Sequence, residues 1–319
     1  MSRIRAALGG LAAAIALAAA PAAAETRVVY KSAKSASSYY QMAVQLAEAV
    51  KAGSAGEIVL TVEESQGSVQ NVKEAARRSG NYVFTTPPVL VRLAKDGKAM
   101  FEAEGGEPYG DVRALFPIPY LTMHMVVRAD TGAETLEDLA GLTFLVGKGS
   151  FGAREARKYL DMFGLAEDVE IANVELGSSV AALKDRQIDG FATAGSYPAP
   201  NVMEAAASVD VRVLSLTDAQ IEETGRTRLV IPAGIYPGQD APVQTTTLPV
   251  GAYTTTEMDE ETAYRLTRTY WEEKADMTDE AAWWGGVDLA EIETLAGPLH
   301  PGALRYYEEV GAAIPESLR

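Results

Sequence analysis

The sequence predicts an α/β fold with two lobes, each a mixed sheet flanked by helices, joined by two crossing strands. Three observations support this prediction: short strand-like runs alternate with helical periods, the same alternation occurs twice along the chain, and an extended run follows each occurrence. Strands that alternate with helices favour parallel sheets with right-handed crossovers. The 295 residues after position 24 also correspond to about two domains.

The first unit reads as strand, helix, strand, helix and strand. Its strands are predicted over residues 28–30, 58–62 and 82–85. Apolar residues from 39 to 50 recur at spacings of three and four, which predicts a helix with one buried face. Ser37 or Ser38 is the expected N-cap of that helix. A second helix is expected over residues 67–78.

The second unit repeats this pattern downstream. Strands are predicted over residues 143–146, 169–174 and 191–194, and helices over residues 153–163 and 177–186. The segment QGSVQNVKEAARRSGNYVFTT of the first unit is similar to LGSSVAALKDRQIDGFATAG of the second. Two similar α/β units in one chain indicate two lobes rather than one large sheet.

Two extended runs connect the units, over residues 121–128 and 245–256. We expect both to cross between the lobes, so that a helix predicted over residues 259–272 returns to the first lobe. This division assigns residues 25–120 and 251–319 to lobe I and residues 121–250 to lobe II. Two crossings create a hinged cleft, and open α/β sheets bind ligands at their strand ends.

Composition and charge exclude several classes of protein. Hydrophobic residues make up 47% and charged residues 23% of the chain, which is typical of a globular protein rather than a disordered one. A net charge of −16 opposes binding to the phosphates of nucleic acids. The absence of cysteine excludes thiol catalysis, cysteine-ligated metals and disulfides.

Residues 1–24 have the pattern of a cleavable signal peptide. Arg3 and Arg5 form a positive start, residues 8–20 form an apolar stretch, and alanines precede the expected cleavage after Ala24. A membrane anchor is the alternative, but a stretch composed largely of alanine is weakly apolar for a membrane span. Removal of the segment leaves 26 basic and 44 acidic residues, a net charge of −18. The sequence therefore predicts an exported protein.

The glycine-rich segment VGKGSFGAR is the most distinctive local motif. Residues 147–152 satisfy G-x-G-x-x-G between a predicted strand and a predicted helix, so a dinucleotide site is one interpretation. Export argues against this interpretation, because nicotinamide cofactors are not normally available outside the cytoplasm. More generally, such a turn presents backbone N–H groups and the positive end of a helix to an anion.

Serines and cations at neighbouring helix starts could complete an anion site. The serines at predicted helix starts are Ser37, Ser38, Ser68 and Ser178, and ordinary capping is the simpler explanation for each one. The cations near the expected cleft are Lys31, Lys34, Lys148 and Arg154. We prefer Lys34 and Arg154 as partners of an anion, because both lie within turns expected at the cleft.

Covalent catalysis has little support in the sequence. Ser150 lies in a Gly-Ser-Phe-Gly segment, but Lys148 replaces the first glycine of G-x-S-x-G and no base can be assigned. His124 is expected to pack within its strand, and His300 is expected to cap or position the final helix. Two distant histidines predict no metal site. We expect no cofactor and no catalytic residue, and an exported hydrolase with Ser150 as nucleophile is the alternative function.

Six longer segments extend over nearly the whole chain after residue 24: SSYYQMAVQLAEAV, EESQGSVQNV, VVRADTGAETLEDLAGLTFLVGKGSFG, LKDRQIDGFATAGSYPAPNVMEAAA, IPAGIYPGQD and LHPGALRYYEEVG. Together, and in this order, they resemble the motifs of the TAXI family of TRAP-transporter solute-binding proteins. The resemblance implies a type II periplasmic-binding-protein fold. It implies capture of a small carboxylate, such as glutamate, a C5 dicarboxylate or a 2-oxo acid, and its delivery to TRAP membrane permease subunits. The resemblance also implies a non-enzymatic protein of the periplasm, which we expect to be a monomer.

The resemblance further implies ligand-binding positions. Matches to family motifs occur at Ser38 and Tyr39, at Gly67, Ser68 and Asn71, at Gly149 and Ser150, and over residues 195–200. Three positions in the predicted pocket depart from the family, namely Lys34, Thr86 and Phe151. The expected ligand-binding residues are Lys34, Ser37, Ser38, Tyr39, Gly67, Ser68, Asn71, Thr86, Gly149, Ser150, Phe151, Arg154, Gly195, Ser196 and Tyr197.

Overall fold

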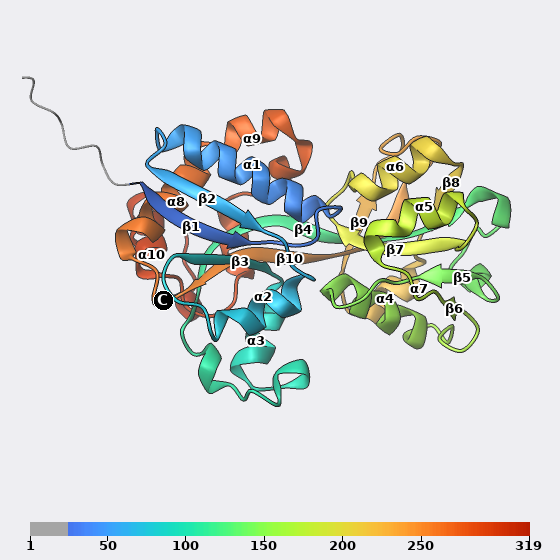
Figure 1. Cartoon of the computed structure of the whole chain (residues 1–319), viewed down its shortest axis with the longest axis horizontal. Helices are drawn as coiled ribbons and strands as arrows, with labels where there is room; N and C mark the ends of the chain where they lie inside the picture. Colours follow the sequence, from blue (N-terminus) through green and yellow to red (C-terminus); the bar gives the residue numbers. More distant parts are fainter. Residues whose placement is uncertain (1–24) are drawn as a thin grey trace, which may run out of the picture.

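The computed structural model describes residues 25–319, which form two lobes that lie side by side (Figure 1). The predicted signal peptide, residues 1–24, lies outside the described residues. Within residues 25–319, no helix combines the length and the apolar character that a membrane span requires. The two-lobed α/β architecture predicted from the sequence is confirmed.

Lobe I begins with three parallel strands and the helices that connect them. Its elements, in order, are β1 (Thr26–Lys31), α1 (Ser38–Gly53), β2 (Ile58–Glu63), α2 (Ser68–Ala75), β3 (Tyr82–Thr86) and α3 (Pro88–Lys95). β1 lies between β2 and β3 and pairs in parallel with both. The carboxyl ends of β1 and β2 point toward lobe II (Figure 1), so the N-termini of α1 and α2 begin at the boundary between the lobes.

Two long antiparallel strands run through both lobes. β4 (Val112–Arg128) and β10 (Val243–Thr255) pair with each other between the lobes and within lobe I. β10 also pairs with β3 in lobe I, and β4 pairs with β7 (Gly190–Gly195) in lobe II. The strand order is β2-β1-β3-β10-β4-β7-β5-β6, so one sheet continues from lobe I into lobe II. The expectation of two lobes rather than one large sheet was therefore wrong about the sheet, because β4 and β10 pair with strands of both lobes.

Lobe II repeats the parallel arrangement on the other side of the crossing strands. Its elements are β5 (Thr143–Leu145), α4 (Phe151–Met162), β6 (Glu170–Ile171), α5 (Ser179–Lys184), β7, α6 (Pro200–Ser208), β8 (Val211–Val213), α7 (Asp218–Thr224) and β9 (Thr227–Ile231). β5 pairs in parallel with both β6 and β7. β8 adds to β4 and β9 adds to β10, both antiparallel.

The C-terminal helices return to lobe I. α8 (Glu260–Glu272), α9 (Lys274–Glu280) and α10 (Pro301–Glu309) follow β10 and lie on the lobe I side of the molecule (Figure 1). The rings of Phe116 and Tyr270 stack with centroids 4.1 Å apart, and the Tyr270 hydroxyl donates to the Pro117 carbonyl over 2.7 Å. These contacts hold α8 against β4 just before that strand leaves lobe I.

Several elements differ in extent from the sequence-based expectation, and β4 begins at Val112 rather than at residue 121. α2 ends at Ala75 rather than at residue 78, because the chain turns there toward Gly80, which has a positive φ of 73°. β6 contains only two residues, since it lies at the end of the sheet order and pairs with β5 alone. The second Gly-Ser segment forms a 3₁₀ turn, Leu176–Ser178, before α5 begins.

Both histidines have the structural roles expected from the sequence. His124 is 1% exposed within β4, where Nδ1 donates to the Thr122 carbonyl over 3.2 Å and Nε2 accepts from the Tyr236 hydroxyl over 2.8 Å. His300 is the N-cap of α10, and its Nδ1 accepts from the backbone N–H of Gly302. Burial lowers the pKa of His124 to about 4, so this side chain is neutral near pH 7.

Candidate functional site

A small cavity of about 70 Å³ lies between the two lobes, where the carboxyl ends of their strands meet. Lobe I contributes Ala33, Lys34, Ala36, Ser37, Tyr39, Gln66, Gly67, Ser68 and Pro87 to its wall. Lobe II contributes Val146, Lys148, Ser150, Phe151, Gly152, Ala153, Glu175, Leu176, Gly177, Ala192, Thr193 and Ala194. Leu121 and Val250, from the crossing strands, complete it. The cavity therefore lies at the position where an α/β cleft binds its ligand.

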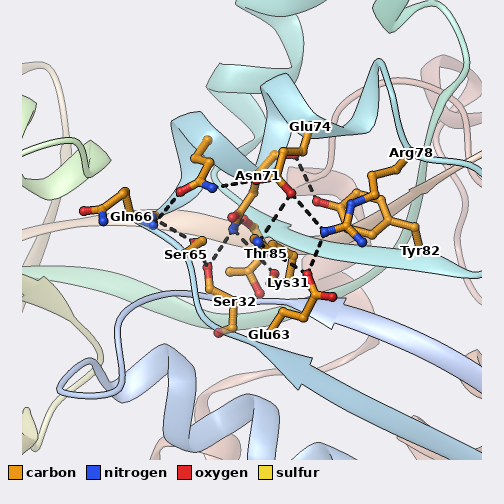
Figure 2. Close-up of polar contacts among 12 residues, drawn as sticks. Lys31, Ser32, Glu63, Ser65, Gln66, Asn71, Glu74, Arg78, Tyr82 and Thr85 are labelled. Atoms are coloured by element: carbon orange, nitrogen blue, oxygen red, sulfur yellow. Dashed lines mark hydrogen bonds and ion pairs between the residues drawn. The ribbon is translucent and has the colours of Figure 1, made fainter.

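The start of α2 forms the lobe I side of the cavity and is held by buried hydrogen bonds (Figure 2). The Ser65 hydroxyl accepts from the backbone N–H of Gly67 over 3.0 Å and donates to the Ser32 carbonyl over 3.0 Å. The Asn71 amide nitrogen donates to the carbonyls of Ser32 and Thr85 over 2.6 and 2.9 Å. Because Asn71 is completely buried, these bonds fix α2 relative to the ends of β1 and β3.

A cluster of four charged side chains lies beside the C-terminal end of α2 (Figure 2). Lys31, which is 7% exposed, pairs with Glu63 over 3.3 Å and with Glu74 over 3.4 Å. Arg78 also pairs with both carboxylates. Burial raises the pKa of Glu63, but hydrogen bonds from Arg78 and Lys31 outweigh it and lower that pKa below its usual value. The cluster thus balances two cations against two carboxylates, so Lys31 is committed to its partners and does not line the cavity.

The start of α4 forms the opposite side. The Ser150 hydroxyl caps this helix by accepting from the backbone N–H of Ala153 over 3.0 Å. Within residues 25–319, no acceptor is found for the backbone N–H groups of Phe151 and Gly152, so both remain available to an anion. Gly152 allows close packing, since a Cβ there would lie 2.3 Å from the Cβ of Ala194 in β7.

The two lobes touch around the cavity. A Cβ placed on Gly67, whose φ is +120°, would lie 3.1 Å from the Cβ of Ser150 in lobe II. Ser38 of α1 accepts a hydrogen bond from the backbone N–H of Ser196 over 3.0 Å. A Cβ on Gly195 would lie 2.4 Å from the Ser38 hydroxyl oxygen. The structure is therefore a closed arrangement, in which glycines permit the closest approaches.

An ion pair joins the lobes at the edge of the cavity. Lys34 Nζ lies 2.5 Å from a carboxylate oxygen of Glu175. The hydrogen bond and charge of Lys34 lower the pKa of Glu175, and Lys148 adds a smaller effect in the same direction. Lys148 also lines the cavity, whereas Arg154 is exposed and lies outside its wall.

Tyr39 connects the cavity to a crossing strand. Its ring lines the cavity, and its hydroxyl donates to the Pro119 carbonyl of β4 over 3.0 Å. Burial raises the pKa of Tyr39 well above its usual value, so the hydroxyl keeps its proton and remains a donor. The neighbouring Tyr40 does not line the cavity.

The structure brings together seven of the residues expected from the sequence to bind a ligand. The residues in the cavity wall are Lys34, Ser37, Tyr39, Gly67, Ser68, Ser150 and Phe151. Ser38, Gly195 and Ser196 form the adjacent contact between lobes, and Gly149 lies beside Gln66. Asn71 and Thr86 are buried in lobe I, and the half-buried Tyr197 packs against the core of lobe II.

Only some of the serines expected to cap helices do so in the structure. Ser37 caps α1 by accepting from the backbone N–H of Tyr39. The cap of α2 is Gly67 rather than Ser68, and the Ser178 side chain makes no capping bond to α5. Ser68 is the first helical residue instead, because the Ser65 hydroxyl already accepts from Gly67 and turns the chain.

Several cavity residues were not expected from the sequence, among them Gln66, Pro87, Leu121, Glu175, Thr193 and Val250. Leu121 and Val250 lie at the centres of the crossing strands, where an alternating apolar pattern predicts only a buried face. Glu175 precedes the second Gly-Ser segment, and its position next to this turn was the one available signal. Within residues 25–319, no group of three or more His, Cys, Asp or Glu side chains is arranged to hold a metal ion.

Comparisons with known proteins agree with this architecture. The NMT1-like family profile matches residues 32–311. A solved structure described as periplasmic binding protein BugD has a TM-score of 0.55 at 12% identity, over 91% of this chain and 99% of that chain. A second, described as a periplasmic transporter, has a TM-score of 0.52 at 13% identity, over 92% and 94% of the two chains. These similarities show the periplasmic-binding-protein fold, and the family match shows that the chain belongs to the NMT1-like family.

Proposed function

We propose that this protein is a periplasmic solute receptor that closes its two lobes over a small carboxylate. The observation that carries the proposal is the meeting of two helix N-termini, α2 of lobe I and α4 of lobe II, at one inter-lobe cavity. Unpaired backbone N–H groups at helix starts attract anions, and Lys34 and Lys148 add positive charge beside them. Binding of this kind needs no covalent step.

Closure would be driven by the difference in ligand affinity between the open and the closed form. The groups that meet across the boundary come from both lobes, so a solute held between Ser68 and Phe151 would stabilise the closed arrangement. The crossing strands β4 and β10 would serve as the hinge, because they alone continue from lobe I into lobe II within residues 25–319.

The motif resemblance supports a TRAP-type transporter of the TAXI class as the system that receives the solute. Glutamate, a C5 dicarboxylate or a 2-oxo acid are the ligands that this resemblance suggests. The receptor would act as an exported monomer that delivers its solute to the membrane permease subunits, after removal of residues 1–24.

A hydrolase with Ser150 as nucleophile fits the structure less well. The Ser150 hydroxyl accepts the capping hydrogen bond of α4, and neither His124 nor His300 lines the cavity. Both histidines are buried and hydrogen-bonded elsewhere. Ser150 therefore has no histidine base, which the serine–histidine mechanism requires.

A thermal-shift screen of ligand-free protein against amino acids, 2-oxo acids and dicarboxylates tests the proposal. A binder present at about 100 times its dissociation constant should add roughly 2.7 kcal/mol to the free energy of unfolding. Native mass spectrometry of protein purified without refolding should show a retained small molecule. If neither method detects any solute, the receptor function is wrong, and turnover abolished by Ser150→Ala would establish the hydrolase instead.

A further inference from the structure

The cavity wall is divided into a charged mouth and an apolar interior. The charged groups of the wall are Lys34, Lys148 and Glu175, and Lys148 and Glu175 are exposed. The interior is formed by buried residues, chiefly Tyr39, Pro87, Leu121, Val146, Phe151 and Val250. No charged side chain within residues 25–319 reaches this interior part of the wall. An occupant must therefore place its charge at the mouth and its apolar part inside.

The net charge of the side chains at the mouth would neutralise a ligand that carries one negative charge. Two lysines and one glutamate give the wall a formal charge of +1, and Lys34 is already paired with Glu175 over 2.5 Å. Lys148, together with the unpaired N–H groups of Phe151 and Gly152, remains to receive one carboxylate. A second carboxylate near Glu175 would be repelled by that side chain.

The interior is also unfavourable for a second carboxylate. Among the buried wall residues within residues 25–319 it offers no cation, and its one polar side chain besides Tyr39 is Thr193, whose hydroxyl accepts from the Asn201 amide over 3.0 Å. A carboxylate placed against Leu121, Val146 or Val250 would lose its hydration without gaining a cation or a hydrogen-bond donor from these side chains. A methyl group at the same place would gain apolar contacts. The volume of about 70 Å³ has room for roughly five water molecules, which limits the occupant to a short chain.

We propose that the solute is a short-chain aliphatic monocarboxylate, such as a 2-oxo acid with an unbranched alkyl tail, rather than a dicarboxylate. This inference rests on the proposed receptor function and narrows its ligand. The carboxylate lies at the mouth beside Lys148 and the start of α4. The alkyl tail lies among the buried apolar residues beneath the mouth.

Isothermal titration of ligand-free protein with 2-oxovalerate and 2-oxoglutarate tests this inference. Both probes are five-carbon 2-oxo acids, and they differ only by a terminal methyl group in one and a carboxylate in the other. We expect 2-oxovalerate to bind at least tenfold more tightly. Equal or tighter binding of 2-oxoglutarate or of glutamate would overturn the monocarboxylate inference while leaving the receptor function intact. Binding of a neutral solute alone would overturn it as well, and binding of no solute would remove the receptor function itself.

Variants of the mouth charge sharpen the test. Glu175→Gln raises the formal charge of the wall to +2, so the ratio of the two dissociation constants should move about threefold to tenfold toward 2-oxoglutarate. The ratio is informative because loss of the Lys34 ion pair weakens closure equally for both probes. Lys148→Gln should weaken 2-oxovalerate binding about tenfold. Lys158→Gln, a control at an exposed position of α4, the helix that follows Lys148, should leave it unchanged. An unchanged ratio in Glu175→Gln, or unchanged affinity in Lys148→Gln, would contradict the placement of the carboxylate.

Discussion

The two Gly-Ser segments of the chain are similar in sequence but differ in their structural environment. In lobe I, the segment at Gly67 leads directly into α2, and the residue four positions later, Asn71, is completely buried and hydrogen-bonded to two strand ends. In lobe II, the segment at Gly177 forms a 3₁₀ turn, and the corresponding residue is the exposed Ala181. Buried hydrogen bonds within lobe I thus hold the Gly-Ser segment at Gly67 in place. The segment at Gly177 is an exposed turn, and the neighbouring Glu175 joins it to Lys34 of lobe I.

Lobe II has its buried polar network elsewhere. The Tyr236 hydroxyl accepts from the backbone N–H of Ala199 and donates to His124 in β4. The lobe I network beneath α2 contains ionised groups, while this one contains a histidine that burial keeps neutral. The two lobes should therefore respond differently to acid and to substitution.

Acid should destabilise the protein through His124. The pKa of His124 is about 4 in the folded protein against 6.5 for a free side chain, so the unfolded chain binds a proton first as pH falls. Stability is therefore fully present above pH 6.5 and is lost progressively down to pH 4, by about 3 kcal/mol in total. Urea denaturation across this range measures the loss, and His124→Gln should flatten that part of the profile. If the stability of His124→Gln fell with pH as steeply as that of the wild-type protein, other groups would cause the acid sensitivity.

Asn71→Ala should destabilise the protein by about 2 kcal/mol, because it removes a completely buried donor to the carbonyls of Ser32 and Thr85. Chemical denaturation monitored by circular dichroism gives the free energy of unfolding. The matched change in lobe II, Ala181→Asn, places an amide at an exposed position and should alter that free energy by less than about 0.5 kcal/mol. If the two changes altered the free energy of unfolding equally, the two Gly-Ser segments would not differ in how they stabilise the protein.

Gly67→Ala should cost about 1 kcal/mol and weaken solute binding. Its φ of +120° disfavours any side chain, and the added Cβ would press on Ser150 only when the lobes are closed. Gly286→Ala is the control, since Gly286 lies outside the cavity wall, has no positive φ and has no atom within 4 Å of an added Cβ. Calorimetry of both variants should show reduced affinity in Gly67→Ala alone.

Loss of the Lys34–Glu175 ion pair should have the smallest effect. Both side chains are partly exposed, at 29% and 54%, so solvent screens their attraction. Lys34→Gln should reduce solute affinity by no more than about fivefold, and the reduction should shrink at high salt. Since Lys34 lowers the pKa of Glu175, the ion pair should persist below the usual carboxylate range and be lost only on further acidification. A salt-independent effect would point to a direct contact between Lys34 and the solute instead.

Most of the secondary structure could be predicted because it depends on local patterns. The period of α1, the capping serine at Ser37 and the short runs of β1 and β3 are all visible in the sequence. The extent of β4 was underestimated at its start, because apolar residues 112–120 show no alternation when both faces of a strand are covered. The cap of α2 was placed one residue late, since the bond between Ser65 and Gly67 depends on how the loop folds.

The site was predicted only in part, and the missing residues have a common cause. Lys34, Gly67 and Ser150 lie in turns and Tyr39 lies at the start of α1, where the composition marks them as candidates, and the structure places them in one wall. Leu121, Val250 and Thr193 lie in strands. The pattern of these strands predicts that the residues are buried, but it does not predict that they face the other lobe across a cavity. Arg154 was preferred as a cation, but it lies outside the wall, and Lys148 in the preceding turn lines the cavity.

The sequence by itself determined the two α/β units, the two crossing strands and the glycine- and serine-rich turns at the strand ends, because hydrophobic period and turn chemistry are local properties. Only the tertiary structure decided which turns face each other, that Lys34 meets Glu175, and that the charges gather at the mouth above an apolar interior. Those features depend on contacts between residues more than a hundred positions apart, and long-range packing is what sets them.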